Sequence, residues 1–286
     1  SYGKYKKVCG GTIMWYPGHI AKAKKSIKEN LRAVNAVIEL VDSRAPYSSR
    51  AYEYQELFRN KKRIIVFNKY DICDIKKTDL WIQKFREKGY CVLATNLKSI
   101  NIKNFLMKNV FTVIPETYGE KSAMVVGVPN VGKSTLINSL KGSRSAAVGN
   151  MPGITRGVQW VSVNEKFRLL DTPGILFPEI YKKELSYKLA LLGSLKVEET
   201  DAEEILEYFF EFLIKEYPHI ISQEYMKEEY PFGFFLSEYA KKRNFVKKGG
   251  EADIQRVCKS WLKEINDGKF IKATYESVDE YDDLMI

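Results

Sequence analysis

Histidine, cysteine and long apolar runs are all scarce in this sequence. The 286 residues include 2 His and 4 Cys, and the cysteines have none of the spacings that hold a metal ion. We therefore expect free thiols in a reducing compartment, which favours a cytoplasmic location. No stretch of about eighteen apolar residues occurs, so no membrane insertion is predicted. The first residues also lack the apolar segment of a secretory signal. The four cysteines are Cys9, Cys73, Cys91 and Cys258.

Acidic residues are depleted from the first part of the chain. Residues 1–178 contain 30 Lys and Arg against 13 Asp and Glu, whereas residues 179–286 contain 16 against 23. The excess of positive charge in the first part indicates a polyanionic partner. Nucleic acid is favoured over a membrane surface because no basic amphipathic helix has a large aromatic face. The alternative is that this charge only maintains solubility.

Short apolar segments alternate with helical patterns up to about residue 178, which predicts an α/β fold with a doubly wound, mostly parallel sheet. The expected strands are 36–41, 63–67, 90–93 and 123–126, and the expected helices are 20–34, 50–59 and 78–88. Segments 158–163 and 167–170 are expected to form an antiparallel hairpin at the edge of the sheet.

The pattern becomes helical throughout after residue 178. The expected helices there are 184–192, 201–217, 231–244 and 252–267, and they predict a C-terminal all-helical domain. We accordingly divide the chain into a disordered N-terminal extension (1–13), an α/β domain (14–178) and a helical domain (179–286). His219 and the aromatic residues Phe209, Phe210, Phe212 and Tyr217 are assigned to the helical core.

The most informative stretch follows the apolar segment 123–126. It has the sequence Gly-Val-Pro-Asn-Val-Gly-Lys-Ser-Thr from Gly127 to Thr135, which matches the phosphate-loop pattern G-x-x-x-x-G-K-S. Glycines allow successive backbone N–H groups to point at phosphate oxygens in front of a helix N-terminus. Lys133 is expected to reach the β- and γ-phosphates, and the Ser134 hydroxyl to ligate Mg²⁺. The residues expected at the phosphates are Asn130, Val131, Gly132, Lys133, Ser134 and Thr135.

A second motif, Asn68-Lys69-Tyr70-Asp71, follows an expected strand and indicates guanine. The Asp71 carboxylate can accept two hydrogen bonds from guanine N1–H and the exocyclic amine, a donor pair that adenine lacks. Asn68 is expected either to bind the other edge of the base or to tie loops together, and the stem of Lys69 to lie against the ring. The loop Ala94-Thr95-Asn96, after the next strand, is the candidate for closing the base site.

A third motif, Asp171-Thr172-Pro173-Gly174, ends the last expected strand. Asp171 is expected to hold a water of the magnesium ion, and the Gly174 N–H to contact the γ-phosphate, as in P-loop hydrolases. Thr155 is the expected switch threonine, which ligates Mg²⁺ only when the γ-phosphate is present. Lys133, Thr155 and Gly174 are therefore the catalytic candidates.

Together these motifs resemble the Ras-like GTPases in a rotated order, because the guanine motif (68–71) and closing loop (94–96) precede the phosphate loop. With Trp15-Tyr-Pro-Gly-His19, Asp42-Ser-Arg-Ala-Pro46 and Asp171-Thr-Pro-Gly-Ile175, the chain resembles the YlqF-type circularly permuted GTPases, also called the ribosome biogenesis GTPase A family. The resemblance implies GTP/GDP and Mg²⁺ as ligands. It further implies assembly of the large ribosomal subunit or its precursor, with an RNA-binding helical domain that contacts rRNA. A monomer is expected off the ribosome.

The expected hydrolysis is slow, because Ile175 occupies the position of the water-orienting glutamine of Ras-type enzymes. Asn130 is a candidate ligand for a potassium ion beside the phosphates, with a loop cap as the alternative. His19 has a counterpart linked to hydrolysis in related proteins, with a cap or an RNA contact as the alternative. A rival hypothesis is a GTP-dependent RNA-binding scaffold with negligible turnover. Thr95 and Asn96 depart from the usual closing loop, which leaves their base contact open.

Overall fold

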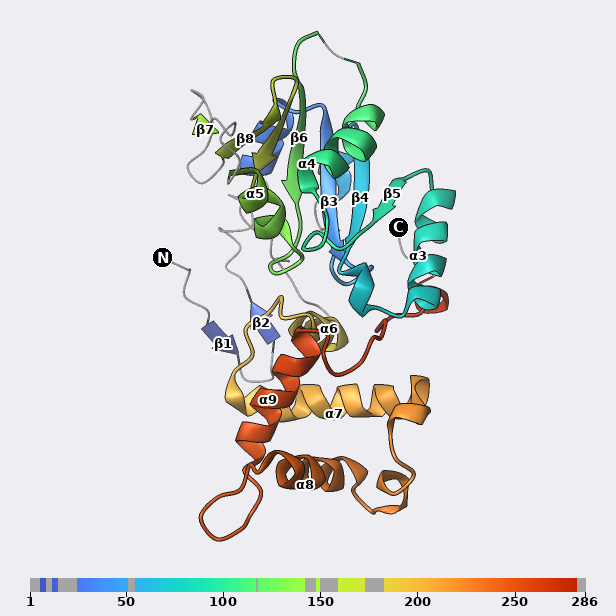
Figure 1. Cartoon of the computed structure of the whole chain (residues 1–286), viewed down its shortest axis with the longest axis vertical. Helices are drawn as coiled ribbons and strands as arrows, with labels where there is room; N and C mark the ends of the chain where they lie inside the picture. Colours follow the sequence, from blue (N-terminus) through green and yellow to red (C-terminus); the bar gives the residue numbers. More distant parts are fainter. Residues whose placement is uncertain are drawn as a thin grey trace.

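The computed structural model describes residues 25–50, 55–116, 118–141, 159–172 and 183–281. It also describes the short strands β1 (Lys6–Val8), β2 (Thr12–Met14) and β7 (Val148–Gly149). In Figure 1 a sheet occupies the upper half of the molecule, and helices α7, α8 and α9 lie below it.

The sheet has seven strands and is mostly parallel. Strands β3, β4, β5, β6 and β9 run parallel to one another, whereas β8 runs antiparallel to β9 and β7 to β8. In spatial order the strands are β5 (Cys91–Ala94), β4 (Lys62–Asn68), β3 (Ala36–Asp42), β6 (Lys121–Val126), β9 (Phe167–Asp171), β8 (Gln159–Asn164) and β7. The predicted doubly wound sheet and the antiparallel hairpin of β8 and β9 are confirmed, but the outermost strand beside the hairpin is β7, which was not predicted.

Buried side chains of successive strand residues point to opposite faces of the sheet, and helices cover both faces. On β3, Ile38 packs with α4 (Ile102–Phe105), the turns that follow it and α5 (Lys133–Lys141). Val37 packs against the helical residues 25–31 and α2 (Gln55–Phe58), and Val41 against α3 (Ile75–Glu87). Every residue of β3 is buried, as expected for a strand with both faces covered, and the charged Glu39 within it is paired with Arg50 and Arg63.

The order of the strands shows the permutation. Strand β6, which leads into the phosphate loop, lies between β3 and β9. The guanine motif therefore precedes the phosphate loop in the chain, while both follow the carboxyl ends of parallel strands at one edge of the sheet. Ligands of open α/β sheets bind at this edge.

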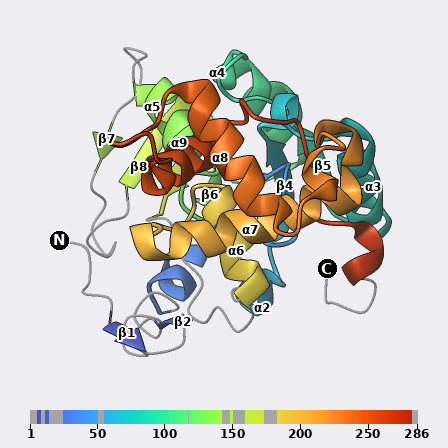
Figure 2. The ribbon, with the colours of Figure 1, turned by 90° about the horizontal axis from the view of Figure 1, so that it is seen from below.

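The C-terminal region consists of α6 (Lys183–Leu191), α7 (Glu199–Glu216), α8 (Pro231–Arg243), α9 (Ile254–Asn266) and short 3₁₀ turns. Phe209 of α7 is fully buried, and its ring lies 5.9 Å from that of Trp261 of α9. Viewed from below, α7 and α8 extend across the base of the molecule (Figure 2). The predicted all-helical region is confirmed over residues 183–266.

Three features differ from expectation or lie outside the described residues. His219 is exposed rather than part of the helical core, because it follows the end of α7 in a 3₁₀ turn. The helical stretch from α4 through the π- and 3₁₀-helical turns to Val113 was not predicted. The extension 1–13 and the proposed boundary at residue 178 fall largely or wholly outside the described residues, so that division stays a prediction.

The chain returns to the sheet region after α9. Trp81 of α3 donates from Nε1 to the Glu276 carbonyl (3.1 Å), and Tyr281 lies against the Trp81 ring at 5.6 Å. In Figure 1 the last red segment accordingly runs up beside α3. Residues 273–281 therefore pack with the sheet region, although they follow the helical region in sequence. In the described part of the chain no helix is long and apolar enough to cross a membrane, and the described cysteines are free.

Candidate functional site

The phosphate loop connects the end of β6 to the start of α5 in a tight turn. A Cβ atom on Gly127 would lie 2.8 Å from Cγ2 of Val131 and 2.9 Å from the Leu40 carbonyl oxygen, so no side chain fits there. Asn130 and Gly132 have φ angles of 65° and 114°, which glycine and asparagine adopt most readily. The loop therefore has the curled backbone and the helix start that a phosphate group requires.

Asn68 ties the phosphate loop to the loop after β5. Its Nδ2 donates to the Val131 carbonyl (2.7 Å) and its Oδ1 accepts from the Leu97 N–H (2.9 Å). The Asn68 side chain is buried, and a Cβ atom on Gly132 would clash with its Nδ2. Asn68 was predicted either to bind the base or to hold loops together, and the described contacts are those of a residue that holds two loops together.

The phosphate loop also meets the end of β9. Lys133 Nζ lies 2.9 Å from Asp171 Oδ1 and donates to the Thr172 carbonyl. Among the described residues no group of three or more His, Cys, Asp or Glu could hold a metal ion. A Mg²⁺ ion does not need such a group, because it is commonly held by one or two side chains together with phosphates and waters. Ser134, exposed in the first turn of α5, and Asp171 are the described residues that fit it.

The guanine motif follows β4 at the same edge. Lys69 has a φ of 61°, and Asp71 is exposed in the 3₁₀ turn Tyr70–Ile72. The Tyr70 N–H donates to the Thr95 carbonyl (3.2 Å), which places the closing loop beside the motif. Asn96 Oδ1 accepts from the Lys98 N–H (3.0 Å), so Asn96 caps its own turn.

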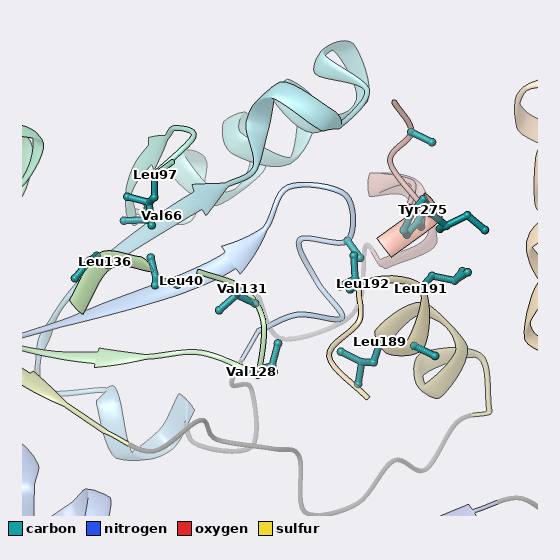
Figure 3. Packing of buried hydrophobic residues seen from close by; sticks show 14 of the residues in the cluster. Leu40, Val66, Leu97, Val128, Val131, Leu136, Leu189, Leu191, Leu192 and Tyr275 are labelled. Atoms are coloured by element: carbon teal, nitrogen blue, oxygen red, sulfur yellow. The ribbon is translucent and has the colours of Figure 1, made fainter. Parts of the chain in front are cut away.

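Asn130 contacts the helical region as well as belonging to the phosphate loop. Its Nδ2 donates to the carbonyl of Leu192, just after α6 (3.2 Å), and Ser194 Oγ donates to the Pro129 carbonyl (2.8 Å). Figure 3 shows Leu189 and Leu192 facing Val128 and Val131 of the phosphate loop, and all four belong to one buried cluster. The sequence predicted no such contact, because no motif links a turn after α6 to a phosphate loop.

Four predicted site residues, His19, Thr155, Gly174 and Ile175, lie outside the described residues. The described residues bring together the phosphate loop, Asp171, the guanine motif and the closing loop. A parallel sheet with these motifs at its carboxyl edge defines a P-loop GTPase, here in circularly permuted order.

Comparisons with known proteins identify the family. The sequence profile of a family described as 50S ribosome-binding GTPase matches residues 122–220. The chain is 40% identical over 264 residues to "Ribosome biogenesis GTPase A" of Thermotoga maritima, covering 92% of this chain and 94% of that protein. It is 34% identical to the protein of the same name from Bacillus cereus, covering 94% and 95%.

A solved structure agrees. GNP-bound YlqF from T. maritima matches with a TM-score of 0.68 and 36% identity, covering 90% of this chain and 98% of that one. The chain belongs to the ribosome biogenesis GTPase A family, and it is therefore a GTPase that binds GTP and GDP.

Proposed function

We propose that the chain hydrolyses GTP slowly and acts as a nucleotide-gated assembly factor on the large ribosomal subunit. The observation that supports it most is the contact of Lys133 with Asp171 and Thr172. This contact joins the phosphate loop to the motif expected to sense the γ-phosphate, while the guanine motif lies at the same sheet edge.

Each site residue has a proposed role in this reaction. Lys133 neutralises the β- and γ-phosphates, and Ser134, Thr155 and Asp171 hold Mg²⁺, directly or through a water. The bound ion stabilises charge that develops on the phosphate oxygens. The Gly174 N–H binds the γ-phosphate, and Asp71 recognises guanine. Val131, Gly132 and Thr135 provide the backbone around the phosphates.

Slow turnover follows from Ile175, whose side chain cannot orient a water molecule. We assign Asn130 as a ligand of a potassium ion through its Oδ1. Its Nδ2 donates to the Leu192 carbonyl, so the oxygen is the atom of the amide that can act as a ligand. His19 is a second candidate for activating hydrolysis on the ribosome.

The proposed partner is rRNA of the large subunit or its precursor, since the relatives are named for ribosome biogenesis. Exposed basic residues lie at the end of α8 and in the loop that follows, and they suit phosphate contacts. Arg243 and Lys241 are in ion pairs with Glu264 and Glu238. The exposed residues are Lys241, Lys242, Arg243, Lys247 and Lys248. We expect a cytoplasmic monomer off the ribosome.

The test measures GTP turnover by the full chain alone, with large subunits and with small subunits, using Lys133→Ala as the inactive control. Slow turnover that large subunits accelerate and small subunits do not would support the proposal. Turnover no faster than that of Lys133→Ala under every condition, together with GTP-dependent subunit binding, would establish the scaffold instead.

A further inference from the structure

A buried group of charges lies where β3 ends, directly beside the guanine motif. The Asp42 carboxylate accepts from Arg44 Nε (3.0 Å, Oδ1) and Nη2 (2.9 Å, Oδ2), and Oδ2 also receives the ammonium of Lys69 at 2.8 Å. The side chains of Asp42 and Arg44 are at most 1% exposed. One carboxylate therefore holds an arginine and the lysine of the guanine motif at once.

The protonation state of this group is secured by its surroundings. Burial would raise the pKa of Asp42, but the positive charges of Arg44 and Lys69 outweigh that effect and lower the pKa. Asp42 is therefore ionised at neutral pH. A buried carboxylate is stabilised only while its cations stay in place. If Arg44 is displaced, Lys69 is therefore the one remaining cation of the described contacts that pairs with the Asp42 carboxylate.

Arg44 also binds the helical region. Its Nη1 donates to the carbonyls of Ile265 (2.8 Å) and Asn266 (3.2 Å), the last two residues of α9. The C-terminus of a helix carries partial negative charge and unpaired carbonyls, so a cation there is favourable. The Arg44 guanidinium thus spans from the Asp42 carboxylate to the end of α9.

A second contact joins the same two parts. Gly268, in the turn after α9, faces Ile72, and a Cβ atom added to it would lie 2.5 Å from Ile72 Cδ1. Ile72 directly follows Asp71, the proposed guanine-reading residue. The segment that carries the guanine motif therefore meets the end of α9 in two ways: directly through Ile72, and indirectly from Lys69 through Asp42 and Arg44.

We propose that Arg44 is a positioning residue for the guanine site, which makes docking of α9 and binding of guanine nucleotides mutually dependent. Through Asp42 it fixes the Lys69 side chain, whose stem is to lie against the base. Through the α9 carbonyls it fixes the helical region. The inference rests on the proposed guanine site. Binding coupled in this way is reciprocal.

The test compares the affinities of wild type, Arg44→Ala, Arg44→Lys and Lys77→Ala for GDP and for a non-hydrolysable GTP analogue. Lys77 is the matched control, because it forms an ion pair with Glu216 of the helical region at 2.6 Å and lies outside the Asp42 group. Hydrogen exchange of residues 263–269 is measured in each variant with and without GDP.

We expect Arg44→Ala to weaken GDP and the GTP analogue alike, by about tenfold, within the 5–150-fold range of two-site coupling. Arg44→Lys should be intermediate, since lysine restores the charge but not the fork of hydrogen bonds. Lys77→Ala should change affinity less than twofold. GDP should slow exchange at residues 263–269 in wild type and not in Arg44→Ala.

Gly268→Ala approaches the same coupling from α9 and covers the case in which Arg44→Ala does not fold. It should weaken GDP binding as well, because the new methyl group collides with Ile72. Unchanged GDP affinity in Arg44→Ala, or in Gly268→Ala where the arginine variant does not fold, overturns the inference. A wild type that binds ATP as tightly as GDP would instead overturn the guanine site itself.

Discussion

Replacement of Asn68 by alanine tests whether this side chain holds two loops together or contacts the base directly. Asn68 is 4% exposed and bridges the phosphate loop to the closing loop. Asn68→Ala removes the donor to the Val131 carbonyl and the acceptor of the Leu97 N–H. Both backbone groups belong to buried residues, so water does not readily replace the lost partner.

The expected cost follows from these two groups. A buried donor or acceptor left without a partner costs about 1–3 kcal/mol, so the free energy of unfolding should fall by roughly 2–6 kcal/mol. Both loops must be in place before phosphate and base can bind. We therefore expect GDP affinity to fall at least tenfold, which corresponds to about 1.4 kcal/mol.

Urea unfolding and nucleotide titration measure these two quantities. Asn68→Asp is the matched variant, because it keeps an acceptor for the Leu97 N–H but places an oxygen against the Val131 carbonyl. It should be destabilised as well. For Asn68→Ala the losses of affinity for guanosine, inosine and xanthosine diphosphates should be equal, since the amide acts on loops rather than on the base.

Two results would refute this reasoning. A free energy of unfolding within about 0.5 kcal/mol of wild type, the usual range for surface substitutions, would show that the bridge is unimportant. A loss of affinity restricted to one base would show that Asn68 reads the base directly.

Three further predictions concern the base, the ion and pH. Asp71→Asn should weaken GTP binding and favour xanthosine triphosphate, whose C2 carbonyl can accept from the amide; an unchanged preference in a competition titration would exclude Asp71. GTP turnover should be faster in potassium than in sodium, and Asn130→Ala should abolish the difference; equal rates in wild type would remove Asn130 from the mechanism. Because the pKa of Asp42 is lowered from its ordinary 3.8, its contribution to stability is present above pH 4 and is lost as the pH falls below that. Asp42→Asn should therefore unfold with a weaker acid dependence, which pH-dependent unfolding checks.

Much of the sheet region could be predicted because its signals are local. The phosphate loop requires particular glycines next to a strand and a helix. β4 and β6 each contain an unbroken apolar run, and residues 36–41 of β3 are apolar except for Glu39, so both motifs and strands were found. The helix after Asn101 was missed. Its later turns, from Leu106 to Val113, are π- and 3₁₀-helical, and the resulting drift in period hides the apolar stripe that a regular helix would show.

Contacts between distant segments could not be predicted. Arg44 and Ile265 are separated by 221 positions, and nothing local in either segment identifies the other as its partner. The sequence gives no sign that the Arg44 side chain is buried, because an arginine in a polar loop is usually exposed. The prediction for His219 was wrong in the opposite direction. It was assigned to the helical core with its aromatic neighbours, but its side chain is exposed.

The placement of the helical region has a consequence for how nucleotide state is transmitted. The covalent connection near residue 178 only limits how far the helical region can lie from the sheet region, whereas packed contacts fix the orientation of the helical region. The contacts through Arg44 and Ile72 lie on the base side, which GDP and GTP share, so they should respond equally to both nucleotides. Only the phosphate side can distinguish the two, and there Asn130 bonds to the carbonyl of Leu192. We infer that base-side contacts set whether the helical region is docked, and phosphate-side contacts set its response to the γ-phosphate.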